Sequence, residues 1–409
     1  MKKQFMMIGF FLVAMLAGCS HDESTQAVDS RQTNVSAEFV SADEAKTIAA
    51  AVQFGSAETG ATGSQATTRS ASLDKKAVLN VTPVADAAGS TAFYVINYEG
   101  GGFMILSADK RMDPVLAYSE TSTFPMNDPK GLPGGLVDWM TETKAYVQDI
   151  RMKDLPLTER MAAAWEPSSI NQMIALGNPQ EPIGEQPIDD DCESESKTYG
   201  PLLMTAWHQE PDFNGLAPFG SCSQLSNGRA YAGCVAVAMA QVMKYYRFPG
   251  RYNWNNMPNS YATHETAKLI RDIGDAVEMD YHCSHSSSDL KKAAKAFTRS
   301  FQYKGAIYKG SIDMDIVRRE IINGRPVLMG GNYYKSPFNY PGHVWVCDGY
   351  KYSMFYYYKC EGYLYEWFSR NWGWGKAKYD GWYTSGDLNS HGGNHYSLMD
   401  EMVYGIVSY

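Results

Sequence analysis

Residues 232–246 read AGCVAVAMAQVMKYY, and this stretch decides how the rest of the chain is interpreted. Its apolar and alanine residues recur at helical spacing and stop before Pro249 and Gly250, so we expect a helix of about three to four turns. Cys234 then lies at the helix start, where free N–H groups and the helix dipole favour thiolate over thiol. Because Gly233 leaves space in front of the sulfur, Cys234 is a candidate nucleophile. A buried structural cysteine is the alternative.

The first residues have the pattern of an export signal. Lys2 and Lys3 precede an apolar run over residues 5–16 that is too short to span a bilayer. It ends in Leu-Ala-Gly-Cys, which is similar to the lipobox of bacterial lipoproteins. We therefore expect residues 1–19 to be a lipoprotein signal peptide in which Cys19 is lipidated, and acyl chains to hold the protein at a membrane. An ordinary secretory signal is the alternative.

The acidic residues 21–23 that follow resemble the surface-export signal of Bacteroidetes lipoproteins. We therefore expect an exported protein that is lipid-anchored in the outer membrane. It would be either surface-exposed or released after processing. The 409 residues carry a net charge of -9 and contain no basic tract, which argues against nucleic acid as a partner.

Seven cysteines are present in the chain. Setting Cys19 and Cys234 aside leaves an odd number, and neither a CxxC pair nor a Cys/His metal spacing occurs. We therefore expect neither a disulfide framework nor a zinc site, and no cofactor or metal. The other cysteines are Cys192, Cys222, Cys283, Cys347 and Cys360.

The first folded part is expected to be a small α+β domain over residues 41–165, after a polar tether at 20–40. A capping box, Ser41 to Glu44, starts a helix that runs to residue 52. A flexible linker is expected at 55–73 because the segment is rich in Gly, Ala, Ser and Thr. This domain contains no nucleophile–base pair. Its strands are expected at 77–81, 92–98, 102–107 and 115–119, and its last helix at 136–161.

Residues 166–200 change in composition, because they are rich in Pro, Ser and acidic side chains. Such a segment buries little apolar surface, so we expect an exposed activation linker at which proteases cut. The second domain then covers residues 201–409. Its later elements are expected to be helices near 263–278, 288–301 and 313–323, and a strand at 327–330.

His343 begins an alternating strand, in which His343, Trp345 and Cys347 share one face. It is the one histidine that starts an apolar strand after a glycine. A strand-borne His far downstream of a helix-borne Cys is typical of papain-like proteases, although a core histidine is the alternative. The imidazole would hold the Cys234 thiolate as an ion pair and later protonate the leaving amine.

The run NWGWG at residues 371–375 follows the histidine strand. Papain-like enzymes use an Asn followed by Trp and Gly at this place. Asn371 would fix the imidazole tautomer, and Trp372 would shield that hydrogen bond from water. An aromatic core strand is the alternative, but a glycine between two tryptophans favours a site of close approach.

The second domain resembles the streptopain family of papain-like bacterial cysteine peptidases. The resemblance rests on GCVA at 233–236, AQVMKY at 240–245, YNWNN at 252–256, MDY at 279–281, GHV at 342–344 and NWGWG at 371–375. The first domain resembles the streptopain prosegment, through FYVIN at 93–97 and GFMILSADKR at 102–111. The resemblance implies Cys234 as nucleophile and His343 as general base and acid. It further implies Trp372 beside the histidine, Asn371 as its orienter, and Trp374 as a cleft wall.

The oxyanion hole would use the backbone N–H of Cys234 and an upstream side-chain amide. Gln224 and Asn227 are the candidates, and Asn227 is nearer the usual spacing. Gly342 is a further candidate for contact with substrate. The segment 351–367 is longer than the family pattern and is expected to form an extended hairpin, and Lys376 replaces a glycine.

The expected fold is therefore α+β: a papain-like domain with a helical half and an antiparallel-sheet half, preceded by a small α+β prodomain. The expected function is a cysteine endopeptidase made as an inactive zymogen. Its partners would be protein or peptide substrates, its own prodomain as inhibitor, and a membrane through the lipid anchor. Two alternatives are a Cys-His acyltransferase or transamidase and a non-catalytic surface binding lipoprotein.

Overall fold

A computed structural model of the chain describes residues 36–55, 73–128, 131–174, 195–331, 342–358, 361–375, 378–385 and 399–409. Residues 38–409 belong to one compact unit. The expected signal peptide with Cys19, the tether up to residue 35, and residues 56–72 of the expected linker lie outside these ranges. Within the described residues, no helix has the length and apolar character needed to cross a membrane.

One antiparallel sheet of 11 strands runs through both halves of the chain. Its strand order is β10-β15-β11-β12-β13-β14-β6-β5-β4-β3, and β7 pairs with β12 off this path. The N-terminal part contributes β3 (Val78–Ala85), β4 (Thr91–Tyr98), β5 (Phe103–Ser107) and β6 (Val115–Ser119). The C-terminal part contributes β7 (Ser196–Tyr199), β10 (Gly305–Lys309), β11 (Val327–Gly331), β12 (His343–Tyr358), β13 (Glu361–Asn371), β14 (Gly381–Thr384) and β15 (Met399–Val407).

The two parts of this sheet join where β6 pairs with β14. Tyr118 lies opposite Trp382, and Ala117 lies opposite Tyr383. We call residues 38–174 the N-terminal domain and residues 195–409 the C-terminal domain. The sequence predicts two separate domains, whereas their strands form one continuous ladder. Alternation along a strand predicts which residues share a face of the sheet, but it does not predict which strands are neighbours.

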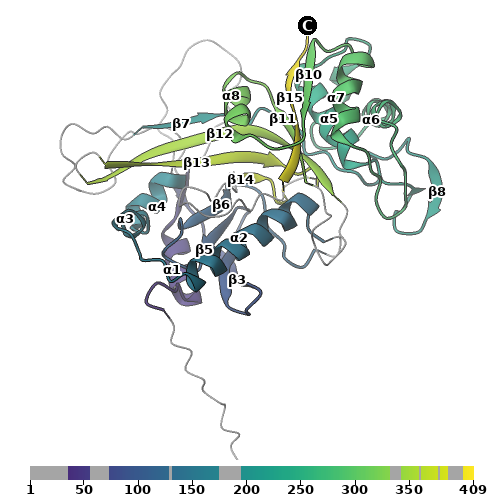
Figure 1. The fold of residues 1–409 in the computed structure, drawn as a ribbon. Helices are drawn as coiled ribbons and strands as arrows, with labels where there is room; N and C mark the ends of the chain where they lie inside the picture. Colours follow the sequence, from purple (N-terminus) through teal and green to yellow (C-terminus); the bar gives the residue numbers. More distant parts are fainter. Residues whose placement is uncertain are drawn as a thin grey trace, which may run out of the picture. The chain divides into compact units, whose positions relative to one another are not determined.

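The helices lie in groups along this sheet (Figure 1). In the N-terminal domain they are α1 (Ala42–Ala51), α2 (Gly134–Met152), α3 (Glu159–Ala164) and α4 (Pro167–Ile174). In the C-terminal domain they are α5 (Cys234–Tyr246), α6 (His264–Ala276), α7 (Leu290–Arg299) and α8 (Met314–Ile322). Three short elements complete the list: the pair β1 (Gln53–Gly55) and β2 (Leu73–Lys75), the pair β8 (Phe219–Cys222) and β9 (Gly228–Arg229), and a 3₁₀ turn at Trp254–Asn256.

Three apolar clusters hold the helices to the sheet. Alternate residues of β12 face opposite ways, as expected: Val344 and Val346 pack with α5, α6 and α7, while Trp345 and Cys347 pack with α2 and α8. The α2 cluster is shared between domains, because Leu136 and Trp139 contact the same core as Trp345. A third cluster packs α1 and α4 on the other face of the N-terminal strands. The fold is α+β, with the expected helical and sheet halves in its C-terminal domain.

The prediction of an exposed linker at 166–200 is wrong at both ends. Residues 167–174 form α4, whose Ile170, Met173 and Ile174 are buried. Residues 196–199 form β7, which pairs with β12. The apolar residues of α4 recur at helical spacing. This short pattern was overlooked because the segment as a whole is rich in Pro, Ser and acidic residues. Residues 175–194 lie outside the described ranges.

One helix prediction differs in detail, and two other predictions are confirmed. The helix expected at 136–161 is two helices, because α2 stops at Met152, Asp154 has a φ of 46°, and Thr158 caps α3 through its side chain. The extended hairpin expected at 351–367 is confirmed, since β12 and β13 pair along most of their length. The helix at Ser41 also starts as predicted, with the Ser41 side chain accepting a hydrogen bond from the Glu44 N–H.

Candidate active site

Cys234 is the first residue of α5, as its sequence context predicts. The preceding Gly233 has a φ of 90°, a region that favours glycine. A Cβ at Gly233 would also lie 2.5 Å from the end of the Met279 side chain, which would have to move to make room for it. The thiol is half-buried in this state.

His343 begins β12 and is 5% exposed. Its Nε2 atom lies 2.8 Å from the backbone carbonyl oxygen of Trp372. Because a carbonyl oxygen can only accept, Nε2 carries the proton and donates, which leaves Nδ1 of the neutral ring as an acceptor. The Trp374 ring lies edge-on to the imidazole, at 5.3 Å between centroids, and the Trp345 ring stacks at 6.4 Å.

The thiol and the imidazole are both held in their neutral forms here. Burial lowers the pKa of His343 to about 4, against a smaller opposite effect of the Trp372 carbonyl. Burial also raises the pKa of Cys234, although backbone hydrogen bonds with Val344, Val235 and Cys234 itself act the other way. The N–H groups at the helix start favour the thiolate, as predicted, but desolvation outweighs them in this state. Among the interactions of the described residues, no hydrogen bond or ion pair joins the Cys234 thiol to the His343 imidazole, although an ion pair was expected.

Asn371 does not orient the imidazole directly, contrary to the expectation. Its Oδ1 accepts from Gln241 Nε2 at 3.0 Å and from the Gly373 N–H at 3.1 Å, and its Nδ2 donates to the Thr205 carbonyl at 2.8 Å. These bonds fix the turn that carries the Trp372 carbonyl. Asn371 thus contacts the turn at Trp372 and not the imidazole itself. The group bonded to His343 is the Trp372 backbone carbonyl, and a sequence pattern cannot identify a backbone partner.

Gln241 is a residue that the sequence analysis missed. It is fully buried on α5, two turns after Cys234, and also accepts a hydrogen bond from Thr205 at 2.8 Å. It connects the helix of the candidate nucleophile to the turn beside the candidate base. A single amide within an otherwise apolar Ala-rich helix was the available signal, since a buried Gln requires partners.

Cys234 and His343 line one cavity of about 480 Å³. The predicted residues Gly342 and Trp374 line it as well. The Trp372 ring was expected to shield the hydrogen bond of the imidazole from water. Instead, the indole packs 5.1 Å from Trp345, in the core shared with α2. The remaining lining residues are Gly131, Leu132, Gly134, His208, Gln209, Glu210, Tyr231, Ser284, His285, Ser286, Ser287, Ser288, Gly331, Val344, Gly373 and Glu401.

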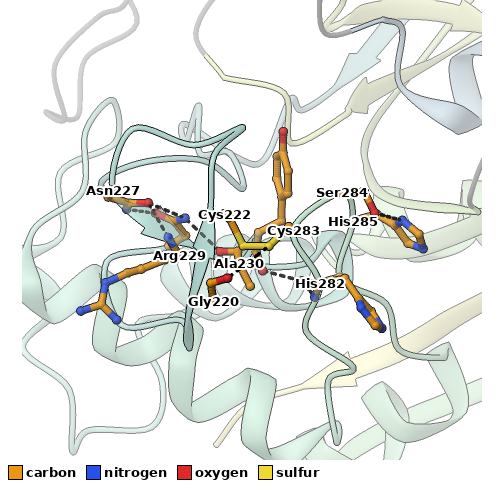
Figure 2. The surroundings of a disulfide bond; sticks show 12 residues. Gly220, Cys222, Asn227, Arg229, Ala230, His282, Cys283, Ser284 and His285 are labelled. Atoms are coloured by element: carbon orange, nitrogen blue, oxygen red, sulfur yellow. Dashed lines mark hydrogen bonds between the residues drawn. A yellow bond between two sulfur atoms is a disulfide. The ribbon is translucent and has the colours of Figure 1, made fainter.

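Asn227 is not among the residues that line the cavity. Its amide group bonds with Asn214 at 2.6 Å and with the Arg229 N–H at 3.2 Å, within the β8–β9 region (Figure 2). Gln209 lies in the cavity wall instead, and its carbonyl accepts from the Ala232 N–H at 2.9 Å, beside the entry to Cys234. The sequence analysis did not consider Gln209, because it lies farther upstream of Cys234 than the side-chain amide that papain-like enzymes use in the oxyanion hole.

The N-terminal domain covers this cavity from one side. Gly131, Leu132 and Gly134 line it, and a Cβ at Gly135 would lie 2.3 Å from the Trp345 ring. Helix α2 therefore rests directly on the ring that stacks against His343. Its Glu142 also attracts the buried Arg370 of β13, whose pKa is lowered by burial.

A second contact between the domains involves Lys351, which is fully buried on β12. Its Nζ donates to Tyr118 Oη at 2.8 Å and to the Ile174 carbonyl at 3.0 Å, and both acceptors belong to the N-terminal domain. Burial lowers the pKa of Lys351 to about 7 and raises that of nearby Glu120 to about 7. The N-terminal domain thus supplies both of these hydrogen-bond acceptors.

One disulfide bond is present, although no disulfide framework was expected. Cys222 and Cys283 form a disulfide bond, while Cys234 and Cys347 are free. An odd count argued against a complete framework, but it does not exclude a single pair. Within the described ranges, no group of three or more His, Cys, Asp and Glu side chains is arranged to hold a metal ion.

In a comparison with known proteins, two family models match parts of this chain. The model of the peptidase C10 family matches residues 207–251 and 250–383, and that of the Spi protease inhibitor matches residues 37–147. The thiol protease/hemagglutinin PrtT of Porphyromonas gingivalis is 26% identical over 366 residues, covering 77% of this chain and 37% of PrtT. This chain therefore spans little more than a third of that relative.

Streptopain of Streptococcus pyogenes is 24% identical over 341 residues, covering 72% of this chain and 74% of streptopain. Among solved structures, a fragment of prointerpain A from Prevotella intermedia matches with a TM-score of 0.54 and 23% identity. That match covers 81% of this chain and 99% of the fragment, and it supports the fold.

Proposed function

We propose that the chain is a cysteine peptidase of the peptidase C10 type, made as a zymogen, with Cys234 as its nucleophile and His343 as its general base and acid. The observation that carries this assignment is that both side chains line one cavity, together with residues of the inhibitor-like N-terminal domain. From here we call that domain the prodomain.

The proposed reaction is amide hydrolysis through a thioester. Nδ1 of His343 takes the proton of Cys234, and the sulfur forms a bond to the substrate carbonyl carbon. The imidazolium then donates its proton to the leaving amine as the C–N bond breaks. Water, deprotonated by His343, attacks the thioester and releases the acid and the thiol. The Trp372 carbonyl keeps Nε2 protonated throughout and so maintains the required tautomer.

The developing oxyanion needs two hydrogen-bond donors. The backbone N–H of Cys234 at the start of α5 is one, as expected from sequence. For the other we assign Gln209, in place of Asn227, because Gln209 is one of the residues that line the cavity, while the amide of Asn227 is bonded to Asn214. Trp374 and Gly342 form adjacent parts of the substrate cleft.

Latency is proposed to arise from desolvation of the dyad. With the prodomain docked, burial favours neutral Cys234 and neutral His343, so the nucleophilic thiolate is suppressed. Residues 131–134 also occupy one side of the cavity. Removal of the prodomain would hydrate both groups and allow the ion pair to form.

Maturation is proposed to occur by cleavage between Ile174 and Glu195. The originally expected range, 166–200, narrows because α4 and β7 are regular elements with buried or paired residues. The acidic, proline-containing composition of the intervening sequence suits a protease site. The prodomain therefore extends to the end of α4 at Ile174, beyond the expected limit of 165, and the enzyme includes β7, which begins at Ser196, before the expected start at 201.

Export with lipidation at Cys19 is proposed on the sequence pattern alone. The lipobox-like Leu-Ala-Gly-Cys and the acidic residues after it support an outer-membrane anchor. Replacing Cys19 by Ala should then move the protein from the membrane fraction to the soluble exported fraction. Retention in the membrane fraction would contradict the anchor.

The catalytic assignment is tested by Cys234→Ala and His343→Ala in the processed enzyme. Each should abolish or severely reduce peptide hydrolysis while thermal unfolding stays close to that of the wild type. Survival of hydrolysis with a modest loss would contradict the assignment. A product that forms only when an amine is added would instead favour the acyltransferase alternative.

A further inference from the structure

The Cys222–Cys283 disulfide joins two segments that are 61 residues apart in sequence (Figure 2). Cys222 ends β8 and is buried, and Cys283 lies half-buried in the loop between α6 and α7. Neither cysteine lines the cavity itself. The residues that follow Cys283 do, because Ser284 through Ser288 form part of its wall.

The loop that carries Cys283 is closed at its base. Asp280 and Ser287 exchange two backbone hydrogen bonds, of 2.9 and 3.0 Å. Cys283 therefore lies within the closed loop, beyond this base. The disulfide is a covalent tie from the loop to β8.

The same loop contacts the segment that leads into the nucleophile. Ser286 Oγ donates to the Tyr231 carbonyl at 2.7 Å, and the Tyr231 N–H donates to the His282 carbonyl at 3.3 Å. Met279, just before the loop, fills the space in front of Gly233. Hydrogen bonds of this kind contribute little net stability alone, because water competes for the same groups.

We propose that the Cys222–Cys283 disulfide is a positioning element of the peptidase that holds residues 284–288 as a wall of the substrate cleft. The proposal rests on the proposed function, since it assigns the cavity of Cys234 and His343 to peptide binding. Reduction leaves Cys234 intact but lets the wall move, so peptides bind less tightly. A rigid wall avoids the entropic cost of ordering a loop on each binding event.

Reduction of this bond is a thiol–disulfide exchange with a dithiol reductant. A thiolate of the dithiol attacks the half-exposed Cys283 sulfur, and Cys222 leaves as a thiolate that takes a proton. The second thiol of the reductant then resolves the mixed disulfide, which releases Cys283 as a thiol and the reductant as a cyclic disulfide. The two cysteines gain two electrons and two protons, which the dithiol supplies.

The test compares the processed wild-type enzyme with the Cys222→Ser/Cys283→Ser double variant. Peptide kcat and KM are measured in weak monothiol, in graded dithiothreitol, and after reoxidation of the reduced wild type. The rate of Cys234 alkylation by iodoacetamide is measured in parallel, because this small reagent needs the nucleophile but not the wall. Cys347→Ala, which removes a free buried thiol outside the wall, controls for loss of a cysteine.

The expected result is a KM raised roughly five- to tenfold in the double variant and in the reduced wild type, with kcat and the alkylation rate nearly unchanged. Reoxidation should restore the wild-type KM, Cys347→Ala should respond to dithiothreitol as the wild type does, and the double variant should be insensitive to it. An unchanged KM in the double variant, or an alkylation rate that falls as much as kcat/KM, would overturn the proposal. Failure of the proposed function is distinguishable, because Cys234→Ala would then retain hydrolysis in the same assay.

Discussion

A Cβ placed on Gly135 would lie 2.3 Å from Cζ3 of Trp345, so the first turn of α2 rests directly on that indole ring. Trp345 in turn stacks against His343 and packs against Trp372, whose carbonyl bonds the imidazole. The prodomain therefore contacts the candidate base through one aromatic ring.

Replacing Gly135 by Leu should weaken latency. The added side chain cannot fit without moving α2 or Trp345, and overpacking of this kind costs about 1–3 kcal/mol. We expect the uncut Gly135→Leu precursor to hydrolyse peptide roughly tenfold faster than the wild-type precursor, since 1.4 kcal/mol corresponds to a factor of ten. Gly250→Ala is the matched control, because a Cβ at Gly250 meets open space. Equal activity of the uncut Gly135→Leu and wild-type precursors would show that the contact between Gly135 and Trp345 does not contribute to latency.

Replacing Lys351 by Met together with Glu120 by Gln should strengthen prodomain docking. Desolvation disfavours the charged forms of Lys351 and Glu120 in the docked state, and replacing charges of this kind by neutral groups is often neutral or stabilising by about 1–4 kcal/mol. The double variant should activate more slowly, measured as the rate of processing at neutral pH. Lys292→Met, on the exposed ion pair with Glu278, should leave this rate unchanged.

The same pair predicts the pH dependence of docking. The docked pKa of Lys351 is lowered to about 7, so docking weakens as pH falls from the ordinary lysine range towards 7. The docked pKa of Glu120 is raised to about 7, so docking weakens as pH rises from the ordinary glutamate range towards 7. Both penalties coincide near neutrality. Inhibition by separately added prodomain should be weakest there, and a double variant with the same pH minimum would contradict this account.

Gln209→Ala should lower kcat by about 10²–10³, the usual loss for one oxyanion donor. The alkylation rate of Cys234 should change little, because alkylation forms no oxyanion. Asn227→Ala is the comparison, since its amide bonds Asn214 outside the cavity. A larger loss of kcat in Asn227→Ala than in Gln209→Ala would restore the original assignment.

Asn371→Ala should reduce kcat by loosening the turn that presents the Trp372 carbonyl. Because Asn371 and Gln241 share a hydrogen bond, their effects should not add. We expect a coupling energy of about 0.5–3 kcal/mol in the cycle of Asn371→Ala, Gln241→Ala and the double variant. Additive losses would instead indicate that Asn371 acts on the imidazole by itself.

Local patterns in the sequence were sufficient for the dyad. The helix at Cys234 and the strand at His343 are each marked by a glycine and by regular apolar spacing, so their positions could be predicted. The faces of β12 followed from alternation alone. The streptopain resemblance then assigned the two residues to one site.

Contacts between distant residues were not predictable in the same way. Lys351 finds its partners in Tyr118 and the Ile174 carbonyl, and Cys222 finds Cys283, at separations that no spacing rule covers. The orienting group for His343 is a backbone oxygen, which carries no residue signature. The N–H groups at the start of α5 favour the Cys234 thiolate, as predicted, but desolvation outweighs them, and the sequence does not reveal how far the thiol is removed from water.

The central claim is that prodomain docking suppresses the Cys234 nucleophile by burying the dyad. It is tested most directly by the rate of Cys234 alkylation with iodoacetamide, located by mass spectrometry, in the uncut precursor and in the processed enzyme at neutral pH. We predict slow alkylation in the precursor and a strong increase after cleavage, which disappears in His343→Ala because the thiol then returns towards its ordinary pKa of about 8.5. Equal alkylation rates before and after cleavage would contradict the account.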